Sequence, residues 1–286
     1  MLHLSSFVWV GKPLKNISFD DLRSWLPASD REIRTALTKH RVVDLDDRLR
    51  SVPPAFLLRT LPPLFSTLPV PAAIAHPARA QKAPPLPKKS KPSSSKLAGK
   101  GDAGPLVAEA DESDLVDALD SVDCGRSVAL EIVAWFGERL EGARDGTPRW
   151  RLDVNALVRE LGIVLLADGG FGKQRLDAFL TRWKDLSGGF APVCDVSLLS
   201  GVHILHPPPV SMIQYLPASS LSPDPATRFA ELFSLNARWP EAELSRFIDD
   251  LTAGDKKKRD ALVLKFVRKV KDKQDETWWT PRNLWS

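Results

Sequence analysis

A segment rich in proline, alanine, lysine and serine divides the sequence. Residues 69–105 read PVPAAIAHPARAQKAPPLPKKSKPSSSKLAGKGDAGP and are nearly free of large apolar side chains. Such a composition cannot bury enough apolar surface to offset the entropy that folding removes. We therefore predict a disordered, basic linker over residues 69–112. Its lysines could act as a nuclear import signal or as a tether that attracts phosphate groups, or the segment could be a solubilising spacer.

The sequence outside this segment has the composition of a globular protein. The chain has 286 residues, of which 43% are hydrophobic and 27% charged, and its formal net charge is +4. Cys124 and Cys194 fit neither a metal-ligand spacing nor a disulfide framework, which favours a reducing compartment. No run of 18 apolar residues occurs and the first residues lack the features of a secretory signal, so we expect no membrane partner.

Residues 1–68 show the element order of a winged helix. Short helices are predicted at 18–26, with Ser18 as N-cap, and at 29–40, where Ser29 and Glu32 have capping-box spacing. Residues 41–52 alternate apolar and polar side chains around two aspartates, which is typical of a β-hairpin. Apolar helical segments then close this unit, which we predict to be the first winged helix.

Two further regions repeat this order. In residues 113–218 we expect amphipathic helices at 127–140, 153–166 and 173–186, and then a strand-turn-strand at 202–217. In residues 219–286 we expect a helix at 224–235, a second opened by Pro240 with Trp239 in the core, a third over 256–273, and a last hairpin. The sequence thus predicts a mainly α protein with small β-hairpins, an α+β fold of three tandem winged-helix domains. Their predicted limits are 1–68, 113–218 and 219–286.

No motif predicts catalysis. The loop ADGGFGKQ at 167–174 resembles a phosphate-binding loop but has Ala167 in place of its first glycine and Gln174 in place of the magnesium-binding hydroxyl, so we interpret it as a glycine-rich turn. His203 and His206 are three apart on a predicted strand and face opposite sides, so they cannot share a metal. The acidic run at 111–123 is interpreted as a solvated helix start. We expect no catalytic residues, no cofactor and no metal.

Positive charge gathers in the third unit. Lysine and arginine side chains there could neutralise phosphates, and a tryptophan of the last hairpin could stack on a base. No cluster of arginine, asparagine or glutamine is arranged to discriminate bases, so we expect contact without sequence preference. The alternative is a solvated basic face with the tryptophans in the core. The candidate DNA-binding residues are Lys256, Lys257, Lys258, Arg259, Lys265, Arg268, Lys269, Lys273, Trp279 and Arg282.

The stretch LPASSLSPDPATRFAELFSLNARWPEAELSRFIDDL, residues 216–251, resembles the C-terminal region of the Dcc family of sister chromatid cohesion proteins. The segments GVHILHPPPVSMIQYLP and LDAFLTRWKDL fit the same family in order. Family members also carry an N-terminal β-rich part that docks on other subunits, and we expect this part to be missing here. The linker would be an insertion between the first and second units.

The resemblance implies a non-catalytic, nuclear subunit of an alternative clamp loader similar to replication factor C. It would act in DNA replication, PCNA loading and sister-chromatid cohesion. The implied partners are the clamp-loader large subunit and its small partner, single- and double-stranded DNA, and the catalytic subunit of the leading-strand polymerase, DNA polymerase epsilon. The first winged helix would face the polymerase. By position, the resemblance makes Lys265, Lys269, Lys273 and Arg282 the DNA-binding candidates.

Two other functions fit the same sequence. One is a winged-helix scaffold for protein interactions that does not bind DNA at physiological salt. The other is a sequence-specific DNA-binding regulator, which would protect a defined site.

Overall fold

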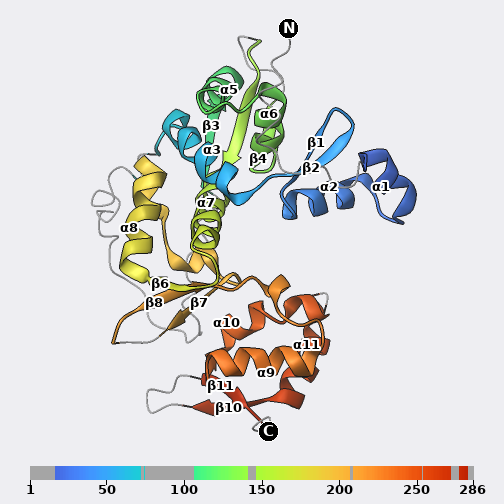
Figure 1. Cartoon of the computed structure of the whole chain (residues 1–286), viewed down its shortest axis with the longest axis vertical. Coiled ribbons are helices and arrows are strands. Elements are labelled where there is room, and N and C mark those ends of the chain that lie inside the picture. The colour runs from blue at the N-terminus through green and yellow to red at the C-terminus, as the bar shows by residue number, and fades with distance from the viewer. Residues whose placement is uncertain are drawn as a thin grey trace, which may run out of the picture. The chain divides into compact units, whose positions relative to one another are not determined.

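The computed structural model describes residues 17–71, 74, 106–140, 146–206, 209–252, 254–271 and 277–282. The chain forms two compact units, one made of residues 1–168 with 180–195 and the other of 169–179 with 196–286 (Figure 1). This division does not coincide with the limits predicted at 1–68, 69–112, 113–218 and 219–286, and each unit is described by itself.

The first unit begins with the predicted helix pair and hairpin. These are α1 (Phe19–Trp25), α2 (Asp30–Lys39), β1 (Val42–Leu45) and β2 (Arg48–Ser51). The predicted N-cap at Ser18 is confirmed, since its hydroxyl accepts from the Asp21 N–H at 3.1 Å, and so is the predicted Ser29–Glu32 capping box. Ser18 and Asp21 form a second capping box, which was not predicted. Asp46 and Asp47 have φ of 51° and 58°, the left-handed conformations that a two-residue hairpin turn requires.

The next helix precedes the predicted linker and packs against helices that follow the linker. It is α3 (Pro54–Thr67), and it packs against α5 (Glu112–Asp120) and α7 (Val154–Asp168), both of which follow the linker in sequence. Its apolar face, which includes Leu57, Leu61 and Leu64, is fully buried. Chain segments from before residue 69 and after residue 105 therefore share one core.

A three-stranded antiparallel sheet completes this part of the first unit. It consists of β3 (Val107–Asp111), β4 (Gly137–Leu140) and β5 (Arg149–Asp153) in the order β3-β5-β4, with α6 (Arg126–Ala134) before β4. Two predictions are wrong here. The linker does not extend to residue 112, because β3 pairs with β5 along its length, and the helix expected through residue 140 ends at Ala134, because the following residues also pair with β5.

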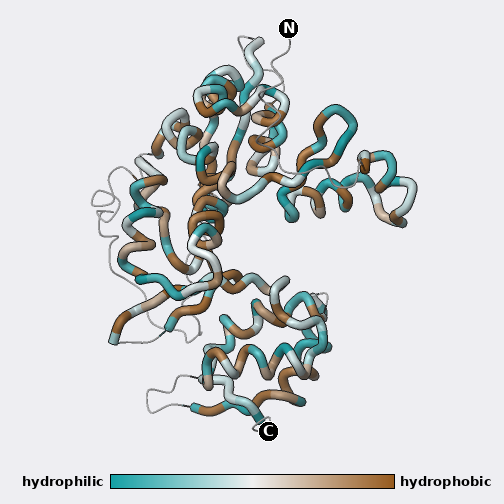
Figure 2. The backbone as a smooth tube through the Cα atoms, in the orientation of Figure 1, coloured by the Kyte–Doolittle hydropathy of each residue, from teal (hydrophilic) through white to brown (hydrophobic). Residues whose placement is uncertain are grey.

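Apolar side chains fill the helices at the centre of the first unit. Figure 2 shows α7 as a largely hydrophobic segment, and its buried residues include Leu157, Val158 and Leu161. The helix α8 (Leu176–Ser187) contributes Trp183, whose indole N–H donates to the Val158 carbonyl at 2.9 Å. The short 3-10 helix η2 (Gly188–Val193) follows.

The second unit contains another three-stranded antiparallel sheet. It has β6 (Lys173–Arg175), β7 (His203–His206) and β8 (Met212–Tyr215) in the order β6-β8-β7, with η3 (Val196–Leu199) before β7. The predicted strand-turn-strand is confirmed as β7 and β8.

The last part of the chain forms a compact core around Trp239. After η4 (Ala218–Ser220) it consists of α9 (Pro225–Leu235), β9 (Trp239–Pro240), α10 (Glu241–Arg246), η5 (Asp249–Thr252), α11 (Lys256–Phe266), β10 (Val267–Lys271) and β11 (Thr277–Pro281). The Trp239 side chain is fully buried, as predicted, and its indole N–H donates to the Leu232 carbonyl at 3.1 Å. The helix expected over 256–273 is wrong beyond Phe266, because residues 267–271 form a strand paired with β11.

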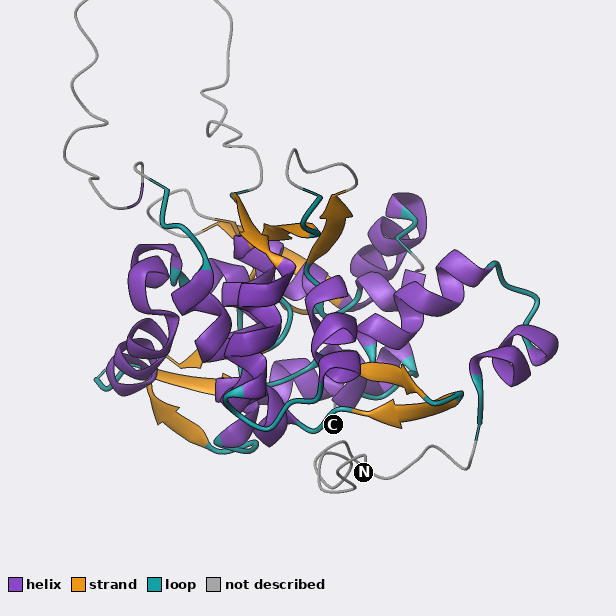
Figure 3. Cartoon of the chain, turned by 90° about the horizontal axis from the view of Figure 1, so that it is seen from above, coloured by secondary structure: helices purple, strands orange, loops and turns teal. Residues whose placement is uncertain are grey.

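The three larger sheets share one topology. In each, the third strand in sequence lies between the first and the second, and helical segments connect the first strand to the second. Figure 3 shows helices as the main elements, with small strands beside them. This confirms the α+β class. No helix in the described ranges is both long and apolar enough to cross a membrane.

Candidate nucleic-acid interface

The start of α11 presents consecutive lysines to solvent. Asp255 is the N-cap, and its carboxylate accepts from the backbone N–H groups of Lys257 and Lys258 at 2.8 and 3.2 Å. These hydrogen bonds fix the first residue of the helix. The side chains of Lys256, Lys257 and Lys258 are all exposed. The amino end of the helix is thus a cluster of solvent-exposed ammonium groups.

Lys265 extends the basic surface toward the other end of α11. It lies two turns after Lys258, so both side chains belong to one face of the helix. Its ammonium group is 5.1 Å from the centroid of the Phe266 ring. Asp224, the N-cap of α9, has a lowered pKa. Hydrogen bonds from Thr227 are the main cause, and the positive charge of Lys265 makes a smaller contribution in the same direction.

The strand β10 carries Arg268 and Lys269 on opposite faces of its sheet. Lys269 stands opposite Trp279, with its ammonium 5.5 Å from a centroid of that indole and 3.3 Å from a Glu241 carboxylate oxygen. Arg268 stands opposite Thr280, whose hydroxyl donates to the Arg268 carbonyl at 3.2 Å. The Arg268 side chain is exposed. Unlike Lys269, it forms no ion pair with a carboxylate of the described chain.

Two predicted arginines bind within the protein. The Arg259 guanidinium forms an ion pair with Asp249 at 3.1 Å, which joins α11 to η5. The Arg282 backbone N–H donates to the Phe266 carbonyl at 3.0 Å, and its guanidinium donates to the Leu264 carbonyl. Both side chains therefore have a structural role in addition to their charge. Lys273 lies outside the described residues.

Trp279 is 2% exposed and belongs to the core. It lies opposite Trp239 in the sheet and is part of the same buried cluster of apolar side chains. Stacking of Trp279 on a base, as the sequence analysis predicts, does not fit this position. Successive side chains of the TWWTP strand point to opposite faces of the sheet. The register with β9 decides which of these faces is buried.

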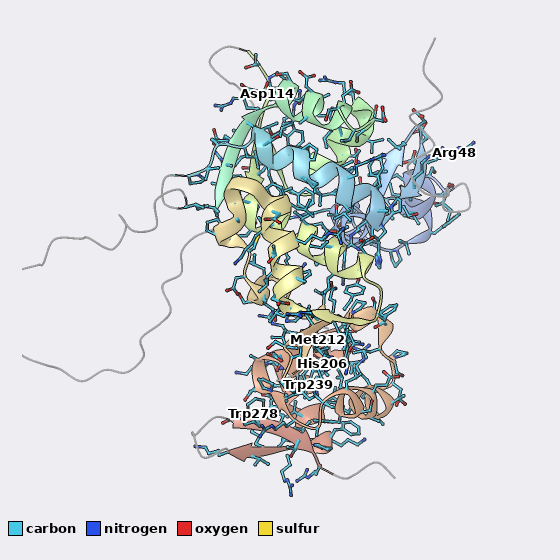
Figure 4. All side chains as sticks on the ribbon, turned by 60° about the vertical axis from the view of Figure 1, so that its left-hand side comes forward. Arg48, Asp114, His206, Met212, Trp239 and Trp278 are labelled. Carbon is cyan, nitrogen blue, oxygen red and sulfur yellow. The ribbon has the colours of Figure 1, made fainter. Side chains whose placement is uncertain are left out.

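The neighbouring Trp278 occupies the opposite face of the sheet. It is half-buried and is labelled in Figure 4. The guanidinium carbon of Arg238 lies 4.9 Å from a centroid of its indole. Arg238 is not among the residues predicted from the sequence. Its position directly before the core residue Trp239 is the sequence feature that could have indicated it. An arginine over an indole forms a planar, cationic surface of the kind that bases and phosphates contact.

The site as a whole is a row of exposed cations along α11 and β10. In the described part of the chain, no carboxylate forms an ion pair with Lys256, Lys257, Lys258, Lys265 or Arg268. Flexible, unpaired cations neutralise phosphate oxygens and release counterions, but they do not read base edges. The arrangement favours a polyanion bound by charge.

The residues considered for other chemistry have structural partners. The Nδ1–H of His203 donates to the Leu199 carbonyl at 2.8 Å, and burial lowers the pKa of His203, whereas His206 contacts Gln214 at 2.8 Å. The glycine-rich loop holds Gly170 at a φ of 69° in a turn between α7 and β6. Among the described residues, no three histidine, cysteine, aspartate or glutamate side chains come together as metal ligands.

Comparison with known proteins gives two matches. A family model described as sister chromatid cohesion protein Dcc1 matches residues 10–248. The sister chromatid cohesion protein of that name from Saccharomyces cerevisiae is 29% identical over 146 residues, which is 50% of this chain and 37% of the yeast protein. The family match ends before α11, so the basic row itself lies outside it.

Proposed function

Because the chain belongs to the sister chromatid cohesion protein Dcc1 family, we propose that it is a non-catalytic subunit of a clamp loader similar to replication factor C. It acts in the nucleus, in DNA replication and sister-chromatid cohesion. Membership over most of the chain supports this assignment, although the match covers little more than a third of the yeast relative. Its partners are the clamp-loader large subunit and the small subunit beside it.

The exposed cations of α11 and β10 carry the proposal that the predicted third winged helix, residues 219–286, binds DNA. Its strands β9, β10 and β11 have the strand order of a winged helix, and α11 is the helix that directly precedes the β10–β11 hairpin. In winged helices this helix and hairpin are common places of contact with nucleic acid. We assign phosphate contact to Lys256, Lys257, Lys258, Lys265 and Arg268, and a secondary part to Lys269, which must exchange its Glu241 partner.

The catalytic subunit of the leading-strand polymerase is the partner we propose for residues 1–68. The capped helix pair and the hairpin of this region leave Trp25 and Leu26 exposed at the end of α1, and exposed large apolar side chains are common at protein interfaces.

The test is DNA binding by the full chain over a series of salt concentrations, measured by fluorescence anisotropy with unrelated single- and double-stranded sequences. The double variant Lys258→Glu and Lys265→Glu should weaken binding to every sequence alike. It should also reduce the slope of log K against log salt by roughly 1 for each phosphate that the protein no longer neutralises. Lys39→Glu with Lys173→Glu, two exposed lysines elsewhere, is the control with the same change of charge.

The two other functions give different results in this assay. If the parent chain does not bind DNA at physiological salt, the protein is a scaffold. If the double variant loses affinity for one sequence only, the protein is a sequence-specific regulator. Recovery of clamp-loader subunits with the tagged chain from nuclear extract tests the assembly independently.

A further inference from the structure

The first unit contains a small cavity that the proposed DNA contact does not use. Its volume is about 180 Å³, it is partly open to solvent, and residues of α1, α2, β1 and the end of α6 line it. Pockets that bind drug-sized ligands have volumes of roughly 300–1,000 Å³. This cavity therefore has room for a single side chain or a similarly small group.

Helical periodicity places the wall residues of two helices on the cavity. From α2 come Arg34, Leu37 and Thr38, at positions i, i+3 and i+4, which form one face of a helix. From α6 and its C-cap come Glu131 and Trp135, which are four positions apart. These faces of α2 and α6 both line the pocket.

The hairpin supplies the remaining wall. Val42 and Asp44 alternate with Val43 along β1, so their side chains share a face, and both line the cavity. The Phe19 ring of α1 also lines it and carries the Arg34 guanidinium above it at 4.6 Å. This contact holds Arg34 over a ring, and no carboxylate within the described chain forms an ion pair with it.

Two carboxylates, Asp44 and Glu131, line the pocket beside these apolar walls, and neither forms an ion pair with a cation of the described chain. Desolvation is the main cause of the raised pKa of Asp44; Asp47 adds to it and the Arg34 charge opposes it. Burial likewise raises the pKa of Glu131, with Arg34 opposing the shift and Asp44 adding to it. One Asp44 carboxylate oxygen is buried and has no hydrogen-bond partner among the described residues. A buried carboxylate without a partner is costly, and a cation would compensate it.

We propose that this cavity binds the side chain of a lysine or arginine from a partner polypeptide. The apolar walls of Leu37, Val42 and Trp135 fit the aliphatic stem of such a side chain, and Asp44 and Glu131 accept hydrogen bonds from its charged end. Asp44 and Glu131 both repel a phosphate and outnumber the Arg34 cation that lines the same pocket, so the pocket selects against the polyanion that the basic row of the second unit attracts. This interaction is independent of the proposed DNA contact.

The test uses the full chain and short capped peptides, Gly-Lys-Gly and Gly-Arg-Gly, each compared with a neutral counterpart that contains acetyl-lysine or citrulline. Binding is followed by NMR through the indole N–H signal of Trp135. We expect the charged peptides to shift this signal, and the neutral ones to bind about tenfold more weakly, which corresponds to one charge-assisted hydrogen bond.

Glu131→Gln and Asp44→Asn test the assignment of the two carboxylates. Both replace a desolvated charge by an amide of the same shape, so the fold should be retained, which circular dichroism checks. Each variant should weaken binding of the charged peptides by a similar factor. The controls are Glu138→Gln on β4 and Asp114→Asn on α5, two exposed carboxylates of the same unit, of which Asp114 is labelled in Figure 4.

Three results would overturn the proposal. The first is that charged and neutral peptides bind equally, which would make the cavity an apolar site. The second is that Glu131→Gln and Asp44→Asn both bind as the parent does. The third is that no peptide shifts the Trp135 signal.

Discussion

Glu112 begins α5 and is 3% exposed, although it belongs to an acidic run that the sequence analysis interpreted as solvated. One carboxylate oxygen accepts from the Trp150 indole N–H at 3.1 Å and pairs with Arg139 at 2.9 Å, and the other pairs with Arg126 at 2.7 Å. For this residue the interpretation was wrong. Its partners Arg126 and Trp150 lie 14 and 38 positions away, so no local pattern could reveal them.

Glu112→Gln should lower the free energy of unfolding by about 1–3 kcal/mol, measured by urea denaturation. The amide still accepts from Trp150 but loses both ion pairs, and the two arginines are exposed enough to be hydrated. Glu138→Gln is the control, since it removes an exposed ion pair with Arg151 and should cost less than about 1 kcal/mol. Equal losses in the two variants would contradict the role given to Glu112.

At the scale of elements, the sequence located most helices but extended three of them into strands. The helix expected over 173–186 begins only at Leu176, because residues 173–175 form β6 and pair with β8. The predicted helix of residues 127–140 ends at Ala134, and that of 256–273 ends at Phe266. In both cases the following residues form an edge of a sheet, β4 or β10. A stretch such as VRKVK is compatible with helical and strand periods alike, and pairing with a distant strand decides between them.

Gly137 shows how closely β4 and β5 approach. A Cβ atom at this position would lie 2.1 Å from the Arg151 carbonyl oxygen and 2.7 Å from a Leu152 methyl carbon. Gly137→Ala should therefore destabilise the first unit by roughly 1–3 kcal/mol, because the backbone must shift. Gly172→Ala is the matched control, since its nearest neighbour would be the Gly169 carbonyl at 3.9 Å. If thermal or urea denaturation shows no difference between these variants, the strand approach is looser than described.

At the scale of the whole molecule, the chain has two cores. Leu57 of α3 is fully buried in the first unit, and Phe229 of α9 is fully buried in the second, where its ring centroid lies 5.0 Å from that of Phe266. Pairing of β3 and packing of α3 place residues from both sides of the predicted linker in the first unit.

Truncation of each core should affect its own unit. Leu57→Ala should lower hydrogen-exchange protection in the first unit, and Phe229→Ala should lower it in the second. We expect the free energy of unfolding to fall by about 2–5 kcal/mol for Leu57→Ala and by about 3–5 kcal/mol for Phe229→Ala. The measurement is native-state hydrogen exchange with peptide resolution. If either variant reduces protection to the same extent in both units, the two units unfold as one.

The sequence by itself determined the features that depend on residues a few positions apart. These are the N-cap at Ser18, the Ser29–Glu32 capping box, the hairpin turn at Asp46 and Asp47, the β7–β8 strand pair, and the exposure of the α11 lysines. The tertiary structure alone decided which tryptophan of the last hairpin is buried, that Glu112 is internal, and that a strand lies inside the predicted linker. The cavity beside Asp44 and Glu131 belongs to the same class. Caps and turns satisfy local backbone groups, whereas burial and strand pairing need partners that only folding brings into contact.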